Sequence, residues 1–382
     1  MRIRILDKVL YGAVRFLKWR DKRETSLENF DKGKVRSILL VLTTGLGDTI
    51  LSTPAIRAAR ENFPDSQIKL LVRESWASLF EKDPYLDGII PYKGKYRKFF
   101  KTIGLLKKEK FDLALIFHGN DPDIIPLVYF PGALFIIRIP NDTTRFKFLL
   151  SNQDIGAMSY LDPNAHYIEN RLKIFDLINC STGDTRMYVN IDEKTQREVD
   201  DRIEAWKGRS QRKLVGIHIF AAGRYRMWPM SKNIEFLDMI ASVADHIAVI
   251  LTGSQQDRKK IAKMIKRFGN SDQIINAAGL FSPIETSALV KRLSLFIVPD
   301  TGPLHMAISV NTPTISLYGP TDHRLIGPLY DKDRHFVIQT APTCEVCTTK
   351  RCKNNICMDQ IGVDEVFEKL VTAMKTIYGK DL

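Results

Sequence analysis

Residues 36–48 read RSILLVLTTGLGD, and this stretch decides the fold class. Its first seven residues form a nearly continuous apolar run, which is typical of a parallel strand buried on both faces. The run ends at a turn with two glycines, and a helical pattern then continues to about Asn62 and stops before Pro64. A buried strand, a tight turn and a helix in this order predict the first unit of a doubly wound α/β sheet.

The same alternation continues along the chain. In the first half it predicts a short helix near residue 76, a lysine-rich helix at 95–109, and strands at 67–72, 89–90 and 111–117. In the second half it predicts strands at 213–219, 247–251, 295–298 and 314–317, and helices at 231–244, 256–267, 283–292 and 363–378. Because the region 140–190 is polar with weaker periodicity, we place a domain boundary near residue 190. We therefore expect two Rossmann-like domains facing a cleft, with ligands at the carboxyl ends of their strands.

Length and composition agree with this organisation. The chain has 382 residues, enough for two domains of ordinary size, and its 44% hydrophobic and 26% charged residues are typical of a globular protein. No stretch reaches the roughly 18 apolar residues needed to cross a bilayer. Arg and Lys interrupt the apolar residues of positions 2–22, so no secretory signal is predicted. The sequence predicts a cytoplasmic protein.

The formal net charge of +13 indicates an anionic partner. Nucleic acid, an anionic membrane surface and phosphorylated substrates all fit such a charge. The sequence has no zinc-finger or RNA-recognition signature, and no basic region followed by heptads. Nucleic acid is therefore not an expected partner.

Part of the positive charge lies in residues 2–23, which hold eight basic residues. Helical spacing places five apolar residues on one stripe, namely Leu6, Val9, Leu10, Ala13 and Leu17. Phe16 and Trp19 add aromatic side chains. A basic amphipathic helix of this kind suits the headgroup layer of an anionic membrane leaflet. A helix that packs on the protein's own surface explains the pattern equally well.

The first loop whose residues are suited to binding or catalysis is Gly45-Leu46-Gly47-Asp48, which opens the first helix. The glycines Gly45 and Gly47 allow a tight turn and close approach of a ligand to the backbone. Asp48 fits two roles, a helix N-cap or a general base, and capping is the more common role of an Asp at this place. The pattern differs from G-x-G-x-x-G, so it does not predict a dinucleotide cofactor.

Two further loops lie in the second half of the chain. Residues 299–305, PDTGPLH, follow a buried strand and start a helix, whose unpaired N–H groups and dipole favour a diphosphate. Residues 221–229, AAGRYRMWP, form a basic loop whose cations can offset charge on a departing diphosphate. Its two arginines, Arg224 and Arg226, are equally compatible with solvated loop charges. Neither of these two loops contains a D-x-D pair, the usual mark of a metal-bound nucleotide sugar.

Together these segments resemble glycosyltransferase family 9, the heptosyltransferases of lipopolysaccharide core biosynthesis. The matching stretches are GLGDTILSTPAIRAARENFP at 45–64, RMWP at 226–229 and VPDTGPLHMAISVNTPTISLYGPTD at 298–322. The cysteine-containing stretch at 344–361 also looks like the C-terminal part of that family. The resemblance implies a glycosyltransferase of the B-type fold, an inverting mechanism and no metal at the chemical step. It further implies a lipid-linked oligosaccharide acceptor and a peripheral location at the inner face of the inner membrane.

The resemblance also assigns roles to regions and residues. A basic segment and linker at 1–34 would precede an acceptor-binding domain at 35–190 and a domain at 191–382 that binds ADP-heptose and ends in a helix. Asp48 would be the general base, beside Gly45 and Gly47 in the acceptor loop. The implied donor contacts are Arg226 to phosphate, Asp300 to sugar hydroxyls, and Thr301, Gly302 and His305 to diphosphate and sugar. The family usually has Lys where this chain has Arg226, and an arginine offers a planar fork in place of a point charge.

Four cysteines lie close together near the C-terminus. Cys344, Cys347, Cys352 and Cys357 have the spacing C-x2-C-x4-C-x4-C, which is dense enough for a structural iron or zinc site. A cytoplasmic location argues against stable disulfides. Three alternatives stay open: a protein heptosyltransferase that modifies an autotransporter adhesin, favoured by the cysteines; a family member that uses another nucleotide sugar; and a catalytically silent binding protein.

Overall fold

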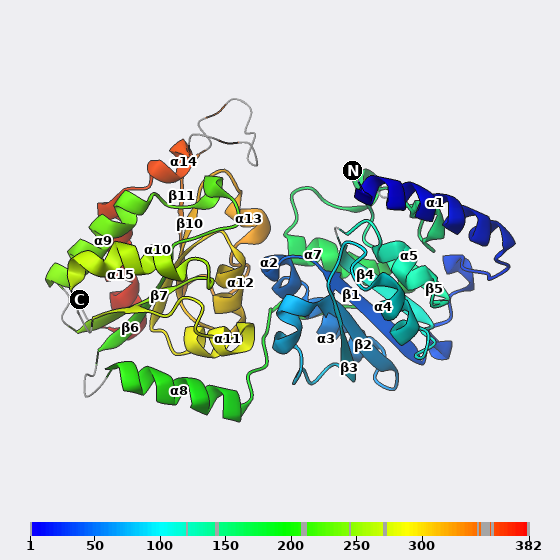
Figure 1. Ribbon diagram of the computed structural model, residues 1–382, viewed down its shortest axis with the longest axis horizontal. Helices are drawn as coiled ribbons and strands as arrows, with labels where there is room; N and C mark the ends of the chain where they lie inside the picture. The colour runs from blue at the N-terminus through cyan, green and yellow to red at the C-terminus, as the bar shows by residue number, and fades with distance from the viewer. Residues whose placement is uncertain are drawn as a thin grey trace. The chain divides into compact units, whose positions relative to one another are not determined.

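A computed structural model of the chain describes residues 2–119, 121–141, 145–207, 212–243, 246–269, 273–341, 344, 352 and 355–379, with the backbone alone at 2–7, 207 and 243. The chain divides into two compact units, Met1–Asn190 and Ile191–Leu382. Each unit contains one parallel sheet with helices packed on it (Figure 1). The expected fold class, two parallel-sheet α/β domains, is confirmed.

The first unit is built on a five-stranded sheet of order β3-β2-β1-β4-β5, and all its paired strands are parallel. Its strands are β1 (Ser37–Thr43), β2 (Gln67–Arg73), β3 (Gly88–Tyr92), β4 (Leu113–Gly119) and β5 (Phe135–Arg138). Every residue of β1 is buried, as its apolar run predicted. The direction in which successive strands are added to the sheet reverses between β1 and β4. Ligands of such sheets bind beyond the carboxyl ends of the strands at that point.

The described part of the first unit also contains helices and short 3-10 turns. They are α1 (Arg2–Arg20), α2 (Leu46–Ile50), α3 (Thr53–Asn62), α4 (Phe99–Leu106), α5 (Ile124–Tyr129), α6 (Ala157–Tyr160) and α7 (Tyr167–Leu172), with short 3-10 turns η1 (Leu27–Asn29), η2 (Lys32–Lys34), η3 (Glu74–Leu79), η4 (Lys147–Leu149) and η5 (Lys173–Ile178). Side chains of α1, α4 and α5 join one hydrophobic cluster with residues of all five strands. These three helices therefore pack over the same side of the sheet.

The second unit is built on a six-stranded sheet of order β11-β10-β9-β6-β7-β8, whose paired strands are also parallel. Its strands are β6 (Lys213–His218), β7 (Ile247–Thr252), β8 (Ile274–Asn276), β9 (Leu295–Pro299), β10 (Thr314–Tyr318) and β11 (His335–Gln339). Its helices are α8 (Glu193–Lys207), α9 (Met230–Val243), α10 (Arg258–Ile265), α11 (Pro283–Lys291), α12 (Gly302–Ser309), α13 (His323–Ile326), α14 (Ile356–Asp359) and α15 (Val363–Tyr378), with 3-10 turns η6 (Arg224–Arg226) and η7 (Lys266–Phe268).

Two helical expectations need correction. The helix expected from the first glycine loop to Asn62 is broken at Leu51 and Ser52 into α2 and α3, and the Ser52 hydroxyl donates to the Asp48 carbonyl. The lysine-rich helix expected at 95–109 is shorter. A left-handed turn precedes it, with positive φ at Lys95, Tyr96 and Lys98, so α4 begins only at Phe99.

The apolar stripe expected on the N-terminal helix is partly wrong. The helix itself is confirmed as α1, but it packs through Leu10, Tyr11 and Val14. Val9 and Leu17 of the expected stripe are exposed. The error arises because α1 carries apolar residues on two sides, and helical spacing alone does not tell which side meets the protein.

Candidate active site

Two polar side chains of the first unit, Asp48 and His118, lie at the carboxyl ends of β1 and β4. Asp48 lies in the first turn of α2, directly after β1. The N-cap residue of this helix is Gly45, three residues before Asp48. The capping role considered for Asp48 is therefore wrong, and its carboxylate is directed elsewhere.

The Asp48 carboxylate is held by a buried arginine. The Arg171 guanidinium places Nη2 2.5 Å from Oδ1 of Asp48 and Nη1 3.0 Å from the Asp48 carbonyl oxygen. The Thr44 hydroxyl lies 3.4 Å from the other carboxylate oxygen. The side chain of Arg171 is 6% exposed and that of Asp48 is 33% exposed. The carboxylate is thus fixed on its protein side and accessible on the other.

Arg171 is a site residue that the sequence did not reveal. Burial lowers the pKa of its guanidinium, and the Asp48 carboxylate opposes this effect. The residue lies on α7, which starts at a capping box formed by His166 and Glu169. The H-x-x-E spacing was a usable signal for the helix start, but nothing local marks Arg171 as a partner of a residue 123 positions away.

His118, near the end of β4, is the second unexpected neighbour of Asp48. Its Nε2 atom lies 3.8 Å from Oδ1 of Asp48. Burial lowers its pKa to about 4, although the Asp48 charge acts in the opposite direction. The imidazole is therefore neutral near pH 7. Its buried Nδ1 atom has no hydrogen-bond partner within the described part of the chain.

In the second unit the structure brings Arg226 and Asp300 together. Asp300 follows β9, and Arg226 lies in η6 after β6, the neighbouring strand in the sheet. Nη1 of Arg226 lies 3.5 Å from Oδ2 of Asp300, and the side chains are 23% and 3% exposed. Among the described residues, no group hydrogen-bonds the buried Nε of Arg226 or the buried Oδ1 of Asp300. The pair therefore has donor and acceptor capacity left for a ligand.

The other predicted donor residues surround the start of α12. Thr301 is the N-cap residue, yet its side chain makes no capping hydrogen bond, and Gly302 is the first helical residue. Both are half-buried. His305 is 1% exposed. The helix start thus offers backbone N–H groups and the Thr301 hydroxyl to an anion, whereas His305 is buried.

The loop with Arg226 is anchored by the C-terminal part of the chain. Nε1 of Trp228 donates to the Ile361 carbonyl at 3.1 Å, and Nδ2 of Asn355 donates to the Met227 carbonyl at 2.5 Å. These bonds fix the backbone on the C-terminal side of Arg226. Arg224, on the other side, is exposed. The two arginines of this loop therefore differ in environment, and only Arg226 faces Asp300.

The four clustered cysteines are not all described. Cys347 lies outside the described residues; Cys344 is an exposed free thiol, Cys352 is half-buried, and Cys357 is a buried free thiol. No group of three or more His, Cys, Asp or Glu side chains is placed to hold a metal in the parts of the chain that the structure describes. The metal site stays a prediction of the sequence.

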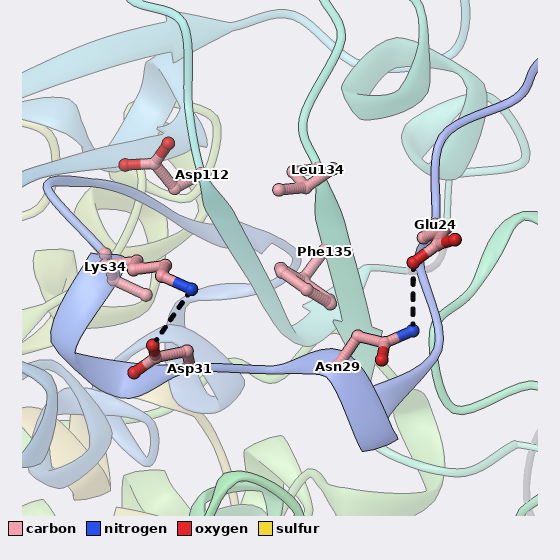
Figure 2. Close-up of a pocket in the computed structure, with 8 residues that line it drawn as sticks. Glu24, Asn29, Asp31, Lys34, Asp112, Leu134 and Phe135 are labelled. Atoms are coloured by element: carbon pink, nitrogen blue, oxygen red, sulfur yellow. Dashed lines mark hydrogen bonds and ion pairs between the residues drawn. The ribbon is translucent and has the colours of Figure 1, made fainter.

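One hollow lies at the opposite edge of the first sheet. It has a volume of about 280 Å³ and lies between the segment 24–35 and the starts of β4 and β5 (Figure 2). Its wall includes the ion pair of Lys34 with Asp31. Ligands of doubly wound sheets bind at the carboxyl ends of strands, so this hollow is not the candidate active site.

Comparison with known proteins identifies relatives. Residues 158–356, more than half of the chain, match the model of glycosyltransferase family 9 (heptosyltransferase). The chain is 24% identical over 294 residues to lipopolysaccharide heptosyltransferase 3 of Escherichia coli, a match covering 72% of this chain and 82% of that protein. It is 22% identical over 347 residues to lipooligosaccharide heptosyltransferase 2 of Campylobacter jejuni, covering 88% and 98%.

The fold also matches a solved structure. The structure of Escherichia coli ADP-heptose lps heptosyltransferase II aligns with a TM-score of 0.70 and 18% identity, over 88% of this chain and 98% of that one. At this identity the likeness concerns the fold. It confirms the expected B-type glycosyltransferase architecture of two parallel-sheet domains.

Proposed function

The chain belongs to glycosyltransferase family 9, the heptosyltransferases, and on that premise we propose that it transfers heptose from ADP-heptose to a lipid A–core oligosaccharide acceptor. The family acts in lipopolysaccharide core biosynthesis, and the chain is a glycosyltransferase. We further propose that the reaction inverts the anomeric configuration, needs no metal at the chemical step and takes place in the cytoplasm at the surface of the inner membrane.

The observation that carries this proposal is the carboxylate of Asp48 held by Arg171. A sugar hydroxyl is a poor nucleophile at neutral pH, and a carboxylate within hydrogen-bond reach can remove its proton during attack. The adjacent guanidinium favours the ionised form of the carboxylate, which is the form a base needs. Asp48 is also exposed on one side, so an acceptor can approach it.

The proposed step balances as a single displacement. The acceptor oxygen forms a bond to the anomeric carbon of the donor while the bond from that carbon to the diphosphate oxygen breaks. The hydroxyl proton passes to Asp48, and the bonding electrons leave with ADP. Direct displacement at one centre by one nucleophile inverts the configuration. Base assistance of this kind contributes about 10²–10⁴-fold to the rate.

The second unit supplies the proposed donor site. Arg226 would bind the diphosphate and stabilise the negative charge that grows on it as the sugar departs. Asp300 would accept hydrogen bonds from sugar hydroxyls, and the start of α12, with Thr301 and Gly302, would bind phosphate oxygens. The free hydrogen-bonding atoms of the Arg226–Asp300 pair support this assignment.

The helix α1 supports the proposed membrane location. One side packs on the first unit through Leu10, Tyr11 and Val14. The other side leaves Phe16 56% exposed and Trp19 81% exposed, and Val9 and Leu17 are exposed as well. The sequence of the helix also contains six basic residues, namely Arg2, Arg4, Lys8, Arg15, Lys18 and Arg20. A helix with this composition suits the interface of an anionic bilayer. No helix of the described residues combines the length and the apolarity required to cross a membrane.

The test compares the turnover number kcat with the affinity for the donor. We expect Asp48→Asn to lower kcat by about 10²–10⁴-fold while the affinity for ADP-heptose, measured by calorimetry, stays within about twofold of the parent. Asp65→Asn, at an exposed carboxylate of the same unit, is the matched control and keeps full activity. Unchanged transfer by Asp48→Asn would exclude Asp48 as the base.

A donor screen tests the sugar nucleotide separately. ADP-heptose, ADP, UDP-hexoses and GDP-mannose are titrated into the protein. Selective binding of ADP-heptose supports the proposed donor. Preference for another nucleotide sugar would keep the glycosyltransferase chemistry and overturn the heptose assignment.

A further inference from the structure

The segment around α4 is the second place in the first unit where exposed apolar and basic side chains occur together. Phe100 is 84% exposed and Leu105 is 44% exposed, although both belong to α4. The neighbouring Phe99 and Leu106 are buried in the hydrophobic cluster below. Two adjacent phenylalanines thus have opposite environments, one in the core and one in solvent.

The backbone before α4 is held in place. Gly94, Lys95, Tyr96 and Lys98 adopt positive φ values, and the Tyr96 N–H donates to the buried carboxylate of Asp123 at 2.8 Å. The ring of Phe99 packs against Tyr96 and Phe130. These contacts define the orientation of α4, and the exposure of Phe100 follows from it.

Basic side chains surround Phe100 and Leu105. Eight exposed lysines and arginines lie between residues 93 and 110, namely Lys93, Lys95, Arg97, Lys98, Lys101, Lys107, Lys108 and Lys110. Glu74 pairs with Lys93 and Lys98, and Glu109 pairs with Lys69. Within the described residues, Arg97, Lys101 and Lys108 form no ion pair, so their charge is available to an external anion.

The exposed sides of α4 and α1 point away from the same core. Val14 of α1 and Phe99 of α4 belong to one cluster over one side of the sheet. All six residues of α5 are buried, and all but its proline belong to the same cluster. Tyr129, the last residue of α5, donates to Asp21 at the end of α1, and α5 also packs against α4. Figure 1 shows α1, α5 and α4 on this side of the first unit.

From this arrangement we propose that α4, together with α1, forms one membrane-docking surface that binds anionic lipid headgroups. The surface is defined by Phe16 and Trp19 of α1, Phe100 and Leu105 of α4, and the basic residues beside them. Apolar side chains enter the boundary between headgroups and acyl chains, and the lysines and arginines bind phosphate groups. The inference rests on the proposed lipid-linked acceptor and adds a second contact to the one at α1.

The positive charge of this surface favours anionic lipid headgroups over a second copy of the protein as its binding partner. Protein interfaces are depleted of lysine at their centres, whereas lysines surround the exposed apolar residues of α4. Anionic headgroups tolerate such a density of positive charge because each basic residue meets negative charge at the surface.

The experiment measures cosedimentation of the full-length protein with vesicles of phosphatidylcholine alone or mixed with phosphatidylglycerol. We expect binding to the mixed vesicles, and a decrease of roughly tenfold or more in the double variant Phe100→Ser/Lys101→Glu. Phe16→Ser/Trp19→Ser, in α1, should also weaken binding. Lys259→Glu, at an exposed position in the second unit, has the same charge change as Lys101→Glu and should bind like the parent protein.

Each result decides between parts of the proposal. Unaltered vesicle binding by the α4 variant would overturn the second contact and leave the one at α1. Equal binding to vesicles with and without phosphatidylglycerol would overturn the headgroup assignment. A parent protein that sediments as a dimer, which the α4 variant converts to a monomer, would show that a second copy covers the surface. ADP binding, measured in every variant, verifies folding and separates a lost membrane contact from a failure of the donor proposal.

Discussion

Nη2 of Arg171 lies 2.5 Å from Oδ1 of Asp48, and the two residues come from segments 123 positions apart. The arginine is almost fully buried, so its charge is satisfied chiefly by this carboxylate and by the Asp48 carbonyl. The same contact fixes the position of the carboxylate, and a neighbouring cation favours the ionised form of a carboxyl group. It also weakens the carboxylate as a base, because a nearby cation opposes its protonation.

Replacing Arg171 should therefore change the pH dependence of the reaction as well as its rate. In Arg171→Met the acid limb of the kcat/KM profile should move to higher pH, because the carboxylate loses the cation that favours its ionised form. We expect kcat to fall by roughly tenfold or more, since the base is no longer held in position. Arg171→Lys should restore the acid limb better than it restores kcat. Equal losses in both variants with an unmoved acid limb would reduce Arg171 to a structural role.

Arg226 should control donor affinity. A charge-assisted hydrogen bond contributes about 1.5–3 kcal/mol, so Arg226→Ala should weaken ADP binding by about 10–100-fold in calorimetry. The matched control is Arg224→Ala in the same loop, because Arg224 is exposed and does not face Asp300. If both variants lost the same affinity, the loop would act through its overall charge and not through the Arg226–Asp300 pair.

His335 should make the second unit sensitive to acid. Burial lowers its pKa to about 4, from an ordinary value of 6.5, and its Nδ1 atom lies 3.0 Å from the Thr314 hydroxyl. Between these two values the unfolded chain binds a proton that the folded chain does not. His335 should therefore contribute a fall of about 2 kcal/mol in the free energy of unfolding from pH 7 to pH 5, and this contribution levels off below pH 4.

The free energy of unfolding is measured by urea unfolding at pH 7 and at pH 5. His335→Gln should remove about this much of the pH dependence, whatever its stability at pH 7. The exposed His246 provides the control, because His246→Gln should leave the pH dependence as it is.

Gly216, in the middle of β6, should tolerate no side chain. A Cβ atom there would lie 2.3 Å from Cδ1 of Leu293 and 2.6 Å from Cδ2 of Phe296. We expect Gly216→Ala to destabilise the second unit by about 1–3 kcal/mol, seen as an earlier urea transition. Gly12→Ala places the methyl group in open space on α1 and should be neutral or slightly stabilising. Equal stability of Gly216→Ala and the parent protein would mean that the two neighbours move aside easily.

The sequence predicted well those elements that are buried on both sides. The strand expected at 295–298 is β9 (Leu295–Pro299), because a short continuous apolar run that ends at a glycine-containing loop is typical of a strand in the middle of a parallel sheet. The short helix α5 and the four-residue strand β5 were missed. Both are too brief to show a period, and Pro126 lies inside α5.

The sequence pointed to candidate residues that follow buried strands, and it missed the residues that contact them from distant segments. Asp48, Arg226 and Asp300 each come after a buried strand, a position that the strand pattern alone identifies. Arg171 and His118 reach Asp48 only through the fold, since a contact between distant segments leaves no periodic signal in either one. The left-handed turn before α4 was also beyond prediction, because lysine and tyrosine rarely adopt that conformation.

The attachment of α1 has a consequence for how substrate is found. Val14 of α1 is fully buried, and Asp21, directly after the helix, accepts hydrogen bonds from Arg23 and Tyr129. The helix α1 therefore moves together with the first unit, which contains Asp48. Because α1 is fixed to the first unit, binding of α1 to a membrane holds that unit at the membrane surface. Once α1 rests on a bilayer, the search for a lipid-linked acceptor becomes lateral diffusion in two dimensions, and the local acceptor concentration is set by area instead of volume. Turnover on membrane-embedded acceptor would then depend on its surface density and not on the total lipid in the sample.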